Sequence, residues 1–308
     1  MSKSITSCDL KPTDESEWTL VWSDEFDGDQ LNPQKWDFDL GNGFFAGKDK
    51  IWVSGWGNEE LQYYTRDPSN IFVRDSALHI RALQQSLHGC AYTSARVKTR
   101  RGDGAPLFIK QYGRFEFRAK VPHGKGLWPA LWLLPHEDHY GSWAASGEID
   151  VMEILGEHPE TVLGSIHFGS SFPERELVTH THSIPDGGSV GEWHVYAVEW
   201  YPGEIRWLFD GVMWARQNFW WSCSSTRDGQ GTTPLGPSEL NAWPAPFDRP
   251  FYVVMNVAVG GNFPGPPNEQ TRFPADLLVD YVRVYDRAKG YEAPKPRGVG
   301  ILPWAKPR

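Results

Sequence analysis

Alternation of apolar and polar residues predicts much of this chain as β-strand. Residues 113–122, GRFEFRAKVP, place Phe115, Phe117, Ala119 and Val121 on one face, with charged residues between them. A period of two is typical of a strand with one buried face. We therefore expect this segment to be a strand whose aromatic side lies in a core.

Further segments repeat the strand pattern. Residues 193–215, WHVYAVEWYPGEIRWLFDGVMWA, read as three short strands. Pro202-Gly203 suits a type II turn between the first two, and Asp210-Gly211 is a strong hairpin signal before the third. Residues 251–259 and 280–285 add two more strands, and no long amphipathic helix is evident. The pattern predicts an all-β protein.

Two segments rich in Gly, Ser and Pro, residues 41–57 and 218–246, are predicted to be long loops. Apolar rings in long loops often line a binding site. The tryptophans of these loops are Trp52, Trp56, Trp220, Trp221 and Trp243. We therefore expect the loops to contribute to a site.

The chain of 308 residues can form a single β-sandwich. We expect an N-terminal extension over residues 1–17, one domain over residues 18–288, and a Pro-rich tail over residues 289–308. The tail is rich in Pro, Lys and Arg and is predicted to be extended and outside the main core.

Charge and hydropathy exclude two classes of partner. The net charge is −9 and no basic stripe is present, so we expect no nucleic-acid partner. No apolar run approaches the roughly 18 residues that a membrane helix needs, so we expect no membrane partner. The polar start lacks the apolar core of a secretion signal. The protein is therefore intracellular, or a signal was removed when this chain was made.

The three cysteines, Cys8, Cys90 and Cys223, lie far apart and form no CxxC pair. We interpret them as buried or incidental thiols. One disulfide stays open as an alternative if the protein is exported.

The most informative stretch is SGEIDVMEIL, residues 146–155, which carries Glu148, Asp150 and Glu153 on an apolar strand. Charge is costly to bury, so the three acids require an explanation. On a regular strand Glu153 would point away from the other two. One extra residue near positions 151–152, a β-bulge, would turn all three toward one cleft.

Paired carboxylates across a short gap fit the hydrolysis of glycosidic bonds. One attacks the sugar carbon and the other protonates the leaving oxygen, and in retaining enzymes they lie about 5–5.5 Å apart. Close like charges raise one pKa and keep a proton available. The alternative reading is a solvated strand face with incidental acids.

The surrounding blocks occur in a recognisable order from about residue 18 to 286. They are WSDEFDGDQLNPQKW (22–36), WGNEELQYYT (56–65), YTSARVKT (92–99), GLWPALWLLP (126–135), IHFG (166–169), MNVAVGGNFPG (255–265) and DYVRVY (280–285). Together with GEIDVME, they resemble glycoside hydrolase family 16, and in particular its laminarinase-like endo-β-1,3-glucanases.

The resemblance implies roles for individual residues. Glu148 would be the nucleophile, Asp150 its assisting partner and Glu153 the acid/base. The substrate-binding residues would be Asn58, Arg96, Trp128, Trp132, Trp143, His167 and Asn262. Phe263 departs from the family pattern, which often has Trp at this position.

The resemblance also implies a fold and an activity. The fold would be a β-jelly roll of two curved antiparallel sheets with a concave substrate cleft. The activity would be retaining endo-hydrolysis of β-1,3-glucan (laminarin), without a catalytic cofactor. Mixed-linkage glucan, agar, porphyran or carrageenan as substrate, and a non-catalytic glucan-binding module, are the alternatives.

Three further properties follow from the resemblance. A structural calcium ion would be held by Asp280 with backbone oxygens near Glu25 and Ser76, because oxygen ligands suit this hard cation. The protein would be secreted or extracytoplasmic, with its signal peptide already removed. It would act as a monomer on a β-glucan polysaccharide.

Overall fold

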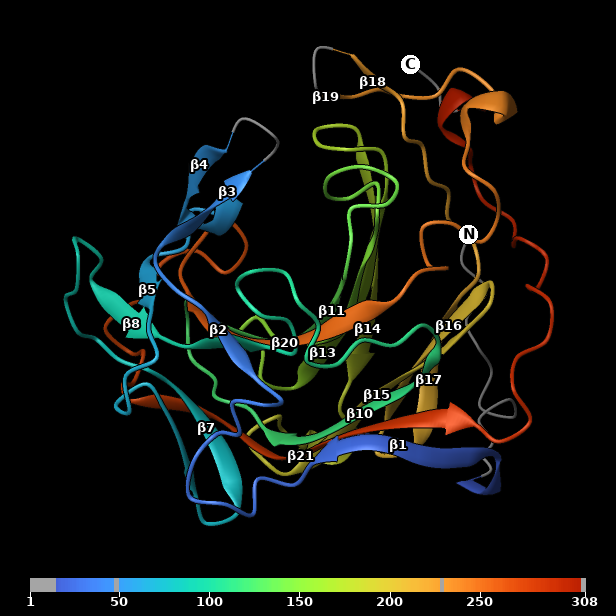
Figure 1. The fold of residues 1–308 in the computed structure, drawn as a ribbon. Coiled ribbons are helices and arrows are strands. Elements are labelled where there is room, and N and C mark those ends of the chain that lie inside the picture. Colours follow the sequence, from blue (N-terminus) through green and yellow to red (C-terminus); the bar gives the residue numbers. More distant parts are fainter. Residues whose placement is uncertain (1–14, 47–49, 228–229, 306–308) are drawn as a thin grey trace.

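The computed structural model describes residues 15–46, 50–227 and 230–305. Over these residues, strands form two large antiparallel sheets that pack face to face, with smaller hairpins and loops around them (Figure 1). Most of the predicted N-terminal extension, together with Cys8, lies outside the described residues. The all-β prediction is confirmed.

The first sheet has the strand order β17-β16-β15-β10-β21-β7-β6, and β1 pairs with β21 beside this path. Its strands are β1 (Trp18–Asp24), β6 (Ile71–Arg74), β7 (Ala77–Ala82), β10 (Gly113–Lys120), β15 (His194–Tyr201), β16 (Glu204–Phe209), β17 (Val212–Gln217) and β21 (Ala275–Arg287). The two turns predicted from Pro-Gly and Asp-Gly join β15 to β16 and β16 to β17.

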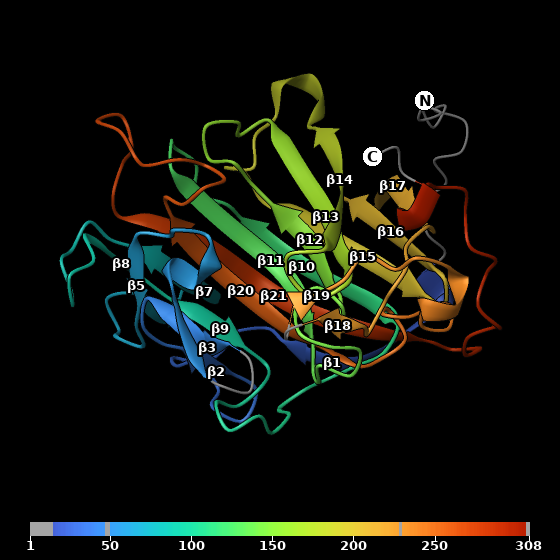
Figure 2. The ribbon, with the colours of Figure 1, turned by 90° about the horizontal axis from the view of Figure 1, so that it is seen from above.

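The second sheet has the order β14-β13-β12-β11-β20-β9-β2. Its strands are β2 (Asp37–Asp39), β9 (Arg96–Lys98), β11 (Leu127–Pro135), β12 (Glu148–Glu153), β13 (Thr161–Gly169), β14 (Arg175–Ser183) and β20 (Phe251–Val259). Figure 2 shows β11 to β14 running side by side, with β14 at one edge of this sheet.

Short elements surround the sheets. The small strand pairs are β3 (Gly43–Ala46) with β4 (Ile51–Ser54), β5 (Gln62–Tyr64) with β8 (Tyr92–Ser94), and β18 (Thr226–Arg227) with β19 (Gln230–Gly231). The 3₁₀ turns are η2 (Glu15–Glu17), η3 (Gly55–Gly57), η4 (Pro185–Gly187), η5 (Pro237–Glu239) and η6 (Pro303–Ala305).

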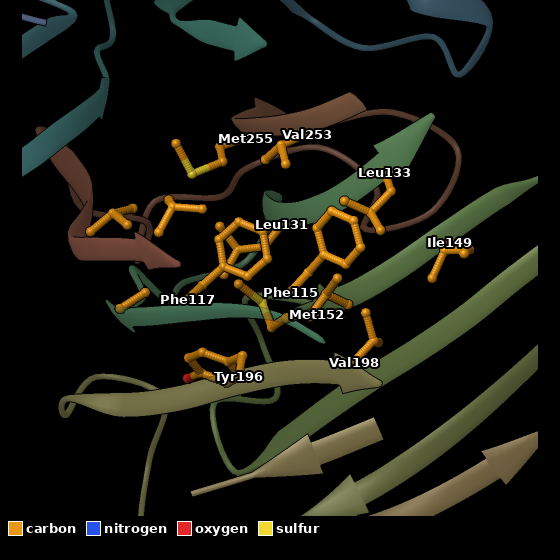
Figure 3. Packing of buried hydrophobic residues seen from close by; sticks show 14 of the residues in the cluster. Phe115, Phe117, Leu131, Leu133, Ile149, Met152, Tyr196, Val198, Val253 and Met255 are labelled. Atoms are coloured by element: carbon orange, nitrogen blue, oxygen red, sulfur yellow. The ribbon is translucent and has the colours of Figure 1, made fainter. Parts of the chain in front are cut away.

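The hydrophobic core fills the space between the two sheets. Phe115 and Phe117 of β10 are fully buried, as their alternation predicted. Figure 3 shows their rings among side chains of the second sheet, including Leu131 and Met152. Because one face of each sheet is used in this contact, the opposite face of the second sheet is left for polar chemistry. We call that opposite face the acid face.

The two predicted long loops contain more structure than expected. Residues 41–57 include the β3–β4 hairpin and η3, and residues 218–246 include the β18–β19 pair and η5. The prediction that all five loop tryptophans line a site was wrong for Trp220 and Trp221, which are buried in the core. The Trp220 indole N–H donates to the Pro244 carbonyl at 2.8 Å, which makes its burial possible.

The described part of the tail is extended and lies against the domain. Lys295 Nζ forms an ion pair with Glu204 at 2.7 Å, and the Lys295 carbonyl accepts the Trp243 indole N–H. Leu302 packs against the core cluster. Among the described residues, no helix is long and apolar enough to cross a membrane.

Candidate active site

A β-bulge in β12 sets the direction of the three acidic side chains. Trp132 of β11 pairs with Asp150, while the preceding Leu131 pairs with Met152, so one residue of β12 is extra. On the other side of β12, the register with β13 also shifts between Asp150 and Glu153. Val151 and Met152 both lie in the core. The bulge predicted from the sequence is therefore confirmed, and Glu153 returns to the acid face.

Glu148 lies at the start of β12 and is held by two neighbours. Trp143 Nε1 donates to Glu148 Oε2 at 2.8 Å. His167 Nε2 lies 3.5 Å from both Glu148 Oε1 and Asp150 Oδ2. The pairing of Glu148 with His167 across β12 and β13 brings the imidazole between the two carboxyl groups. Trp143, predicted as a sugar-binding residue, thus contacts a catalytic candidate directly.

Glu153 has a different set of partners. Trp128 Nε1 donates to Glu153 Oε1 at 3.0 Å, and Ser165 Oγ donates to Glu153 Oε2 at 3.3 Å. Ser165 was not predicted from the sequence. Its position two residues before His167 on one strand was the available signal, since alternate residues share a face.

Burial raises the pKa of all three carboxyl groups. Burial and then the charge of Glu153 raise the pKa of Glu148 to about 8, against the opposing hydrogen bond from Trp143 and the charge of Arg96. Burial and the two glutamates raise the pKa of Asp150 well above its usual range. The cluster therefore keeps a proton near neutral pH, as two-acid chemistry requires.

His167 is neutral in this setting. Burial, followed by the positive charge of Arg175, lowers the pKa of His167 to about 3. A neutral imidazole can donate one hydrogen bond without bringing a full charge to the acids. His167 is therefore suited to orient Glu148 and Asp150.

Glu148, Asp150 and His167 also form a group that could hold a cation. Their ligand atoms lie within 4.8 Å of one another, the one such set among the residues that the structure describes. The raised pKa of both carboxyl groups disfavours the charged forms that a metal ion needs. We assign the group to acid/base chemistry.

Arg96 lies between two indole rings on the acid face. Its guanidinium carbon is 4.6 Å from the ring centroids of both Trp56 and Trp132. Arg96 Nε also pairs with Asp39 at 2.9 Å, and Trp132 Nε1 donates to Asn256 Oδ1 at 2.8 Å. Arg96 and Trp132 thus form the floor beside the acids, where the sequence predicted substrate contacts.

The predicted residues Asn58 and Asn262 meet in neighbouring loops. The backbone N–H of Asn262 donates to the Asn58 carbonyl at 2.7 Å. The Asn58 side chain donates to Glu60, which also accepts from Gln62 and Tyr64. The sequence pattern did not indicate Glu60, whose burial raises its pKa. Glu60 fixes the loop that carries Asn58.

Phe263 departs from the family pattern and lies next to Trp128. Their ring centroids are 5.3 Å apart in an edge-on arrangement, and Phe263 is about half exposed. A ring is therefore present at this position, beside the indole that contacts Glu153.

The predicted calcium ligands come together around one position of β21. Asp280 is the extra residue of a bulge, between Val279 and Tyr281 in the register with β10. Ser76 immediately precedes β7 and Glu25 immediately follows β1, and both strands pair with β21 nearby. Asp280 accepts a hydrogen bond from Arg118, and Glu25 pairs through both carboxylate oxygens with Arg283. The set supplies oxygen donors, as calcium prefers.

Comparison with known proteins fits this geometry. A family model described as glycosyl hydrolases family 16 matches residues 58–219, which include all three acids. The chain is 40% identical to "Beta-glucanase" of Rhodothermus marinus over 296 residues, covering 91% of each protein. This chain belongs to glycosyl hydrolase family 16. It is also 41% identical over 276 residues to "Glucan endo-1,3-beta-glucosidase A1" of Niallia circulans, covering 86% of this chain and 37% of that protein.

Solved structures of the family share the fold. The X-ray structure of the laminarinase from Rhodothermus marinus matches with a TM-score of 0.70 at 40% identity, over 87% of this chain and 97% of that one. The endo-beta-1,3-glucanase from Pyrococcus furiosus matches with a TM-score of 0.73 at 34% identity, over 91% and 98%. The β-jelly-roll prediction is confirmed.

Proposed function

We propose that this family 16 protein hydrolyses β-1,3-glucan chains internally, with retention at the anomeric carbon. The observation that carries the proposal is the bulge in β12, which brings Glu148, Asp150 and Glu153 to one face with separate partners. The Trp143 indole N–H donates to Glu148, and the Trp128 indole N–H donates to Glu153. Two carboxyl groups in different surroundings can take different roles.

In the first step, a Glu148 carboxylate oxygen attacks the anomeric carbon. The bond from that carbon to the leaving sugar oxygen breaks, and the Glu153 proton passes to this oxygen. The N–H of Trp143 steadies the Glu148 carboxylate. Asp150, whose pKa is raised by burial, donates its proton toward Glu148 as a hydrogen bond and so favours the charged nucleophile.

In the second step, water replaces the enzyme on the sugar. Glu153, now a carboxylate, accepts a proton from water while the water oxygen attacks the anomeric carbon and releases Glu148. Two inversions give net retention. The Ser165 and Trp128 hydrogen bonds keep Glu153 in place in both protonation states.

The choice of β-1,3-glucan rests on the relatives and on the fit of the acid face to sugar. The matched proteins of Niallia circulans and Pyrococcus furiosus are named as endo-1,3-glucanases. Exposed indole rings stack on pyranose faces but do not distinguish linkages. Mixed-linkage glucan and the galactans agar, porphyran and carrageenan are therefore the alternative substrates. The intact acid set argues against a purely binding module.

Product analysis on a panel of polysaccharides tests the substrate. We expect laminarin to be cut to short oligosaccharides, mixed-linkage glucan to be cut more slowly, and cellulose to be left intact. Cleavage of agarose or carrageenan without cleavage of laminarin would contradict the substrate assignment. Binding to laminarin without any cleavage would favour the binding module.

We also propose a structural calcium ion held by Asp280 and the backbone oxygens of Glu25 and Ser76. Bound there, the ion would join β1, β7 and β21. An ion that binds the folded state and not the unfolded chain stabilises the folded state by mass action. Added calcium should raise the melting temperature and a chelator should lower it. Asp280→Asn should remove this response, whereas Asp186→Asn, on exposed η4, should keep it. A melting temperature insensitive to calcium in the parent protein would refute the site.

The proposed substrate and the composition of the site bear on where the protein acts and in what oligomeric state. A polysaccharide substrate is too large to enter a cell, which supports a secreted or extracytoplasmic location. One chain supplies all three acids and their partners, which supports action as a monomer. Sedimentation of the purified protein at increasing concentration would reveal any dimer.

A further inference from the structure

The β3–β4 hairpin exposes large apolar side chains on strands that carry no charge. Its strands read GFFA and IWVS. The exposed side chains are Phe44, Phe45, Ile51 and Trp52. Figure 1 shows the hairpin rising above β2, which is an edge strand of the second sheet, and the view from above in Figure 2 shows it over the same edge. An exposed apolar group of this kind usually marks a site of interaction.

The Trp52 ring lies close to the backbone of Gly41 and Gly43. A Cβ added at Gly43 would come within 2.9 Å of Trp52 Cζ2, and one added at Gly41 within 4.0 Å of Trp52 Cη2. Phe45, directly opposite in the hairpin register, meets the indole edge-on at 5.0 Å between ring centroids. Trp52 nevertheless stays 45% exposed. A supported ring with exposed surface suits the apolar face of a pyranose.

The hairpin is continuous with the proposed substrate-binding face. Phe44 stacks on Trp56 at 6.0 Å between centroids, and Trp56 stacks on Arg96, which contacts Trp132 on its other side. The Gly41 carbonyl accepts the Trp56 indole N–H at 3.3 Å. These contacts lead from the floor beside the acids to Phe44, which lies on the opposite face of the hairpin from Phe45 and Trp52. Trp52 meets the same base through Gly41, which lies next to its ring.

We propose that the β3–β4 hairpin is an accessory binding surface for the glucan chain, with Trp52 and Phe45 stacking on sugar units beyond those held beside the acids. This inference rests on the proposed function. A polymer bound beside Glu148 and Glu153 presents its own next units to the hairpin at high effective concentration. The uncharged strands fit a neutral polysaccharide. The surface would therefore favour long chains over short ones.

Hydrolysis of long and short substrates by the same variants tests this proposal. For Trp52→Ala and for Phe45→Ala/Trp52→Ala, we expect KM on polymeric laminarin to rise about fivefold to tenfold. Cleavage of a short β-1,3-glucan oligosaccharide should stay within about twofold of the parent protein. Trp52→Phe should retain most of the polymer preference. The matched control is Trp193→Ala, which removes an exposed indole next to β15 of the first sheet. This variant should hydrolyse both the polymer and the oligosaccharide like the parent protein.

Several results would overturn the proposal. Equal losses on polymer and oligosaccharide would show that the hairpin only shapes the catalytic face. An unchanged KM on polymer would show that it does not contact the chain. A parent dimer that becomes monomeric in Trp52→Ala would show that a second copy covers the surface. Thermal melting of each variant checks that it is folded.

Affinity electrophoresis in laminarin gels separates this proposal from the proposed function. If the parent protein is retarded by laminarin and Trp52→Ala is not, the accessory surface is supported even where no cleavage is detected. Absence of cleavage with hairpin-dependent binding would refute the hydrolase assignment alone. Retardation that is equal in both proteins would refute the hairpin proposal alone.

Discussion

At the scale of single residues, the site depends on buried carboxyl groups that lie too close together for all of them to be ionised. Burial and the charge of Glu153 raise the pKa of Glu148 to about 8 from an ordinary value of 4.5. Near pH 7, the folded acid cluster therefore binds a proton that the unfolded chain releases, and the form that reacts is the one with this proton on Glu153 and with Glu148 ionised. The stability from this group is fully present below about pH 4.5 and is lost as pH rises through about 8.

Glu148→Gln should for this reason be more stable than the parent protein at high pH. The advantage should be small at pH 4.5 and should grow toward pH 8 to at least about 1 kcal/mol, or roughly 2–4 °C in melting temperature. Thermal melting across this range measures it. Glu160→Gln removes an exposed carboxyl group and is the control for the substitution itself. A stability difference for Glu148→Gln that does not change with pH would contradict the raised pKa.

Glu153→Gln separates acid catalysis from nucleophilic attack. Laminarin hydrolysis should fall by about 10²–10⁴-fold, since the leaving sugar needs a proton. A glycosyl fluoride, whose leaving group needs little protonation, should lose much less in the first step. Loss of the Glu153 charge should also lower the pKa of Glu148 and move the acid limb of the pH profile to lower pH. An equal loss of rate on laminarin and on the glycosyl fluoride would contradict the assignment of Glu153 as the acid and would favour it as the nucleophile.

At the scale of elements, β12 is held in place from the core side. Trp207 of β16 donates its indole N–H to the Asp150 carbonyl at 2.8 Å, and Gly164 of β13 leaves room for this ring. A Cβ at Gly164 would lie 2.4 Å from the Trp207 ring. The bulged strand thus depends on a contact between the two sheets.

Gly164→Ala should therefore reduce both stability and activity. We expect a loss of about 1–3 kcal/mol from overpacking, with a fall in kcat as Asp150 and its neighbours shift. Chemical denaturation and steady-state kinetics measure the two effects. Gly236→Ala, where an added Cβ meets nothing within 4 Å, is the matched control. Unchanged activity in Gly164→Ala would show that the indole contact does not position β12.

The sequence predicted the strands and the bulge because both follow from local alternation and the cost of buried charge. The break in period between Asp150 and Glu153 was enough to infer an extra residue. The sequence pattern did not predict the β3–β4 hairpin, whose strands lack a polar face. It also did not predict the burial of Trp220. Each depends on partners distant in sequence or on both strand faces being apolar. Ser165 was missed although it shares a strand face with His167, because its contact with Glu153 depends on the pairing of β12 with β13. Glu60 was missed because it lies in an irregular segment before β5, where no periodic pattern gives the direction of its side chain.

At the scale of the whole molecule, the two sheets have different functions. The first sheet and the inner face of the second make the core, and the outer face of the second carries the acids and the rings beside them. The family resemblance supplied the expected roles of these groups, and the geometry supplies reasons why each could perform its role. We propose that Glu148 and Glu153 act in two successive displacements.

Proton NMR during the first minutes of laminarin digestion tests that claim most directly. Signals of the newly formed reducing end report its configuration before the anomers equilibrate in water. Double displacement predicts that the β-anomer appears first and that the α-anomer grows in later by mutarotation. Initial formation of the α-anomer would mean a single displacement by water, and would contradict the assignment of Glu148 as the nucleophile.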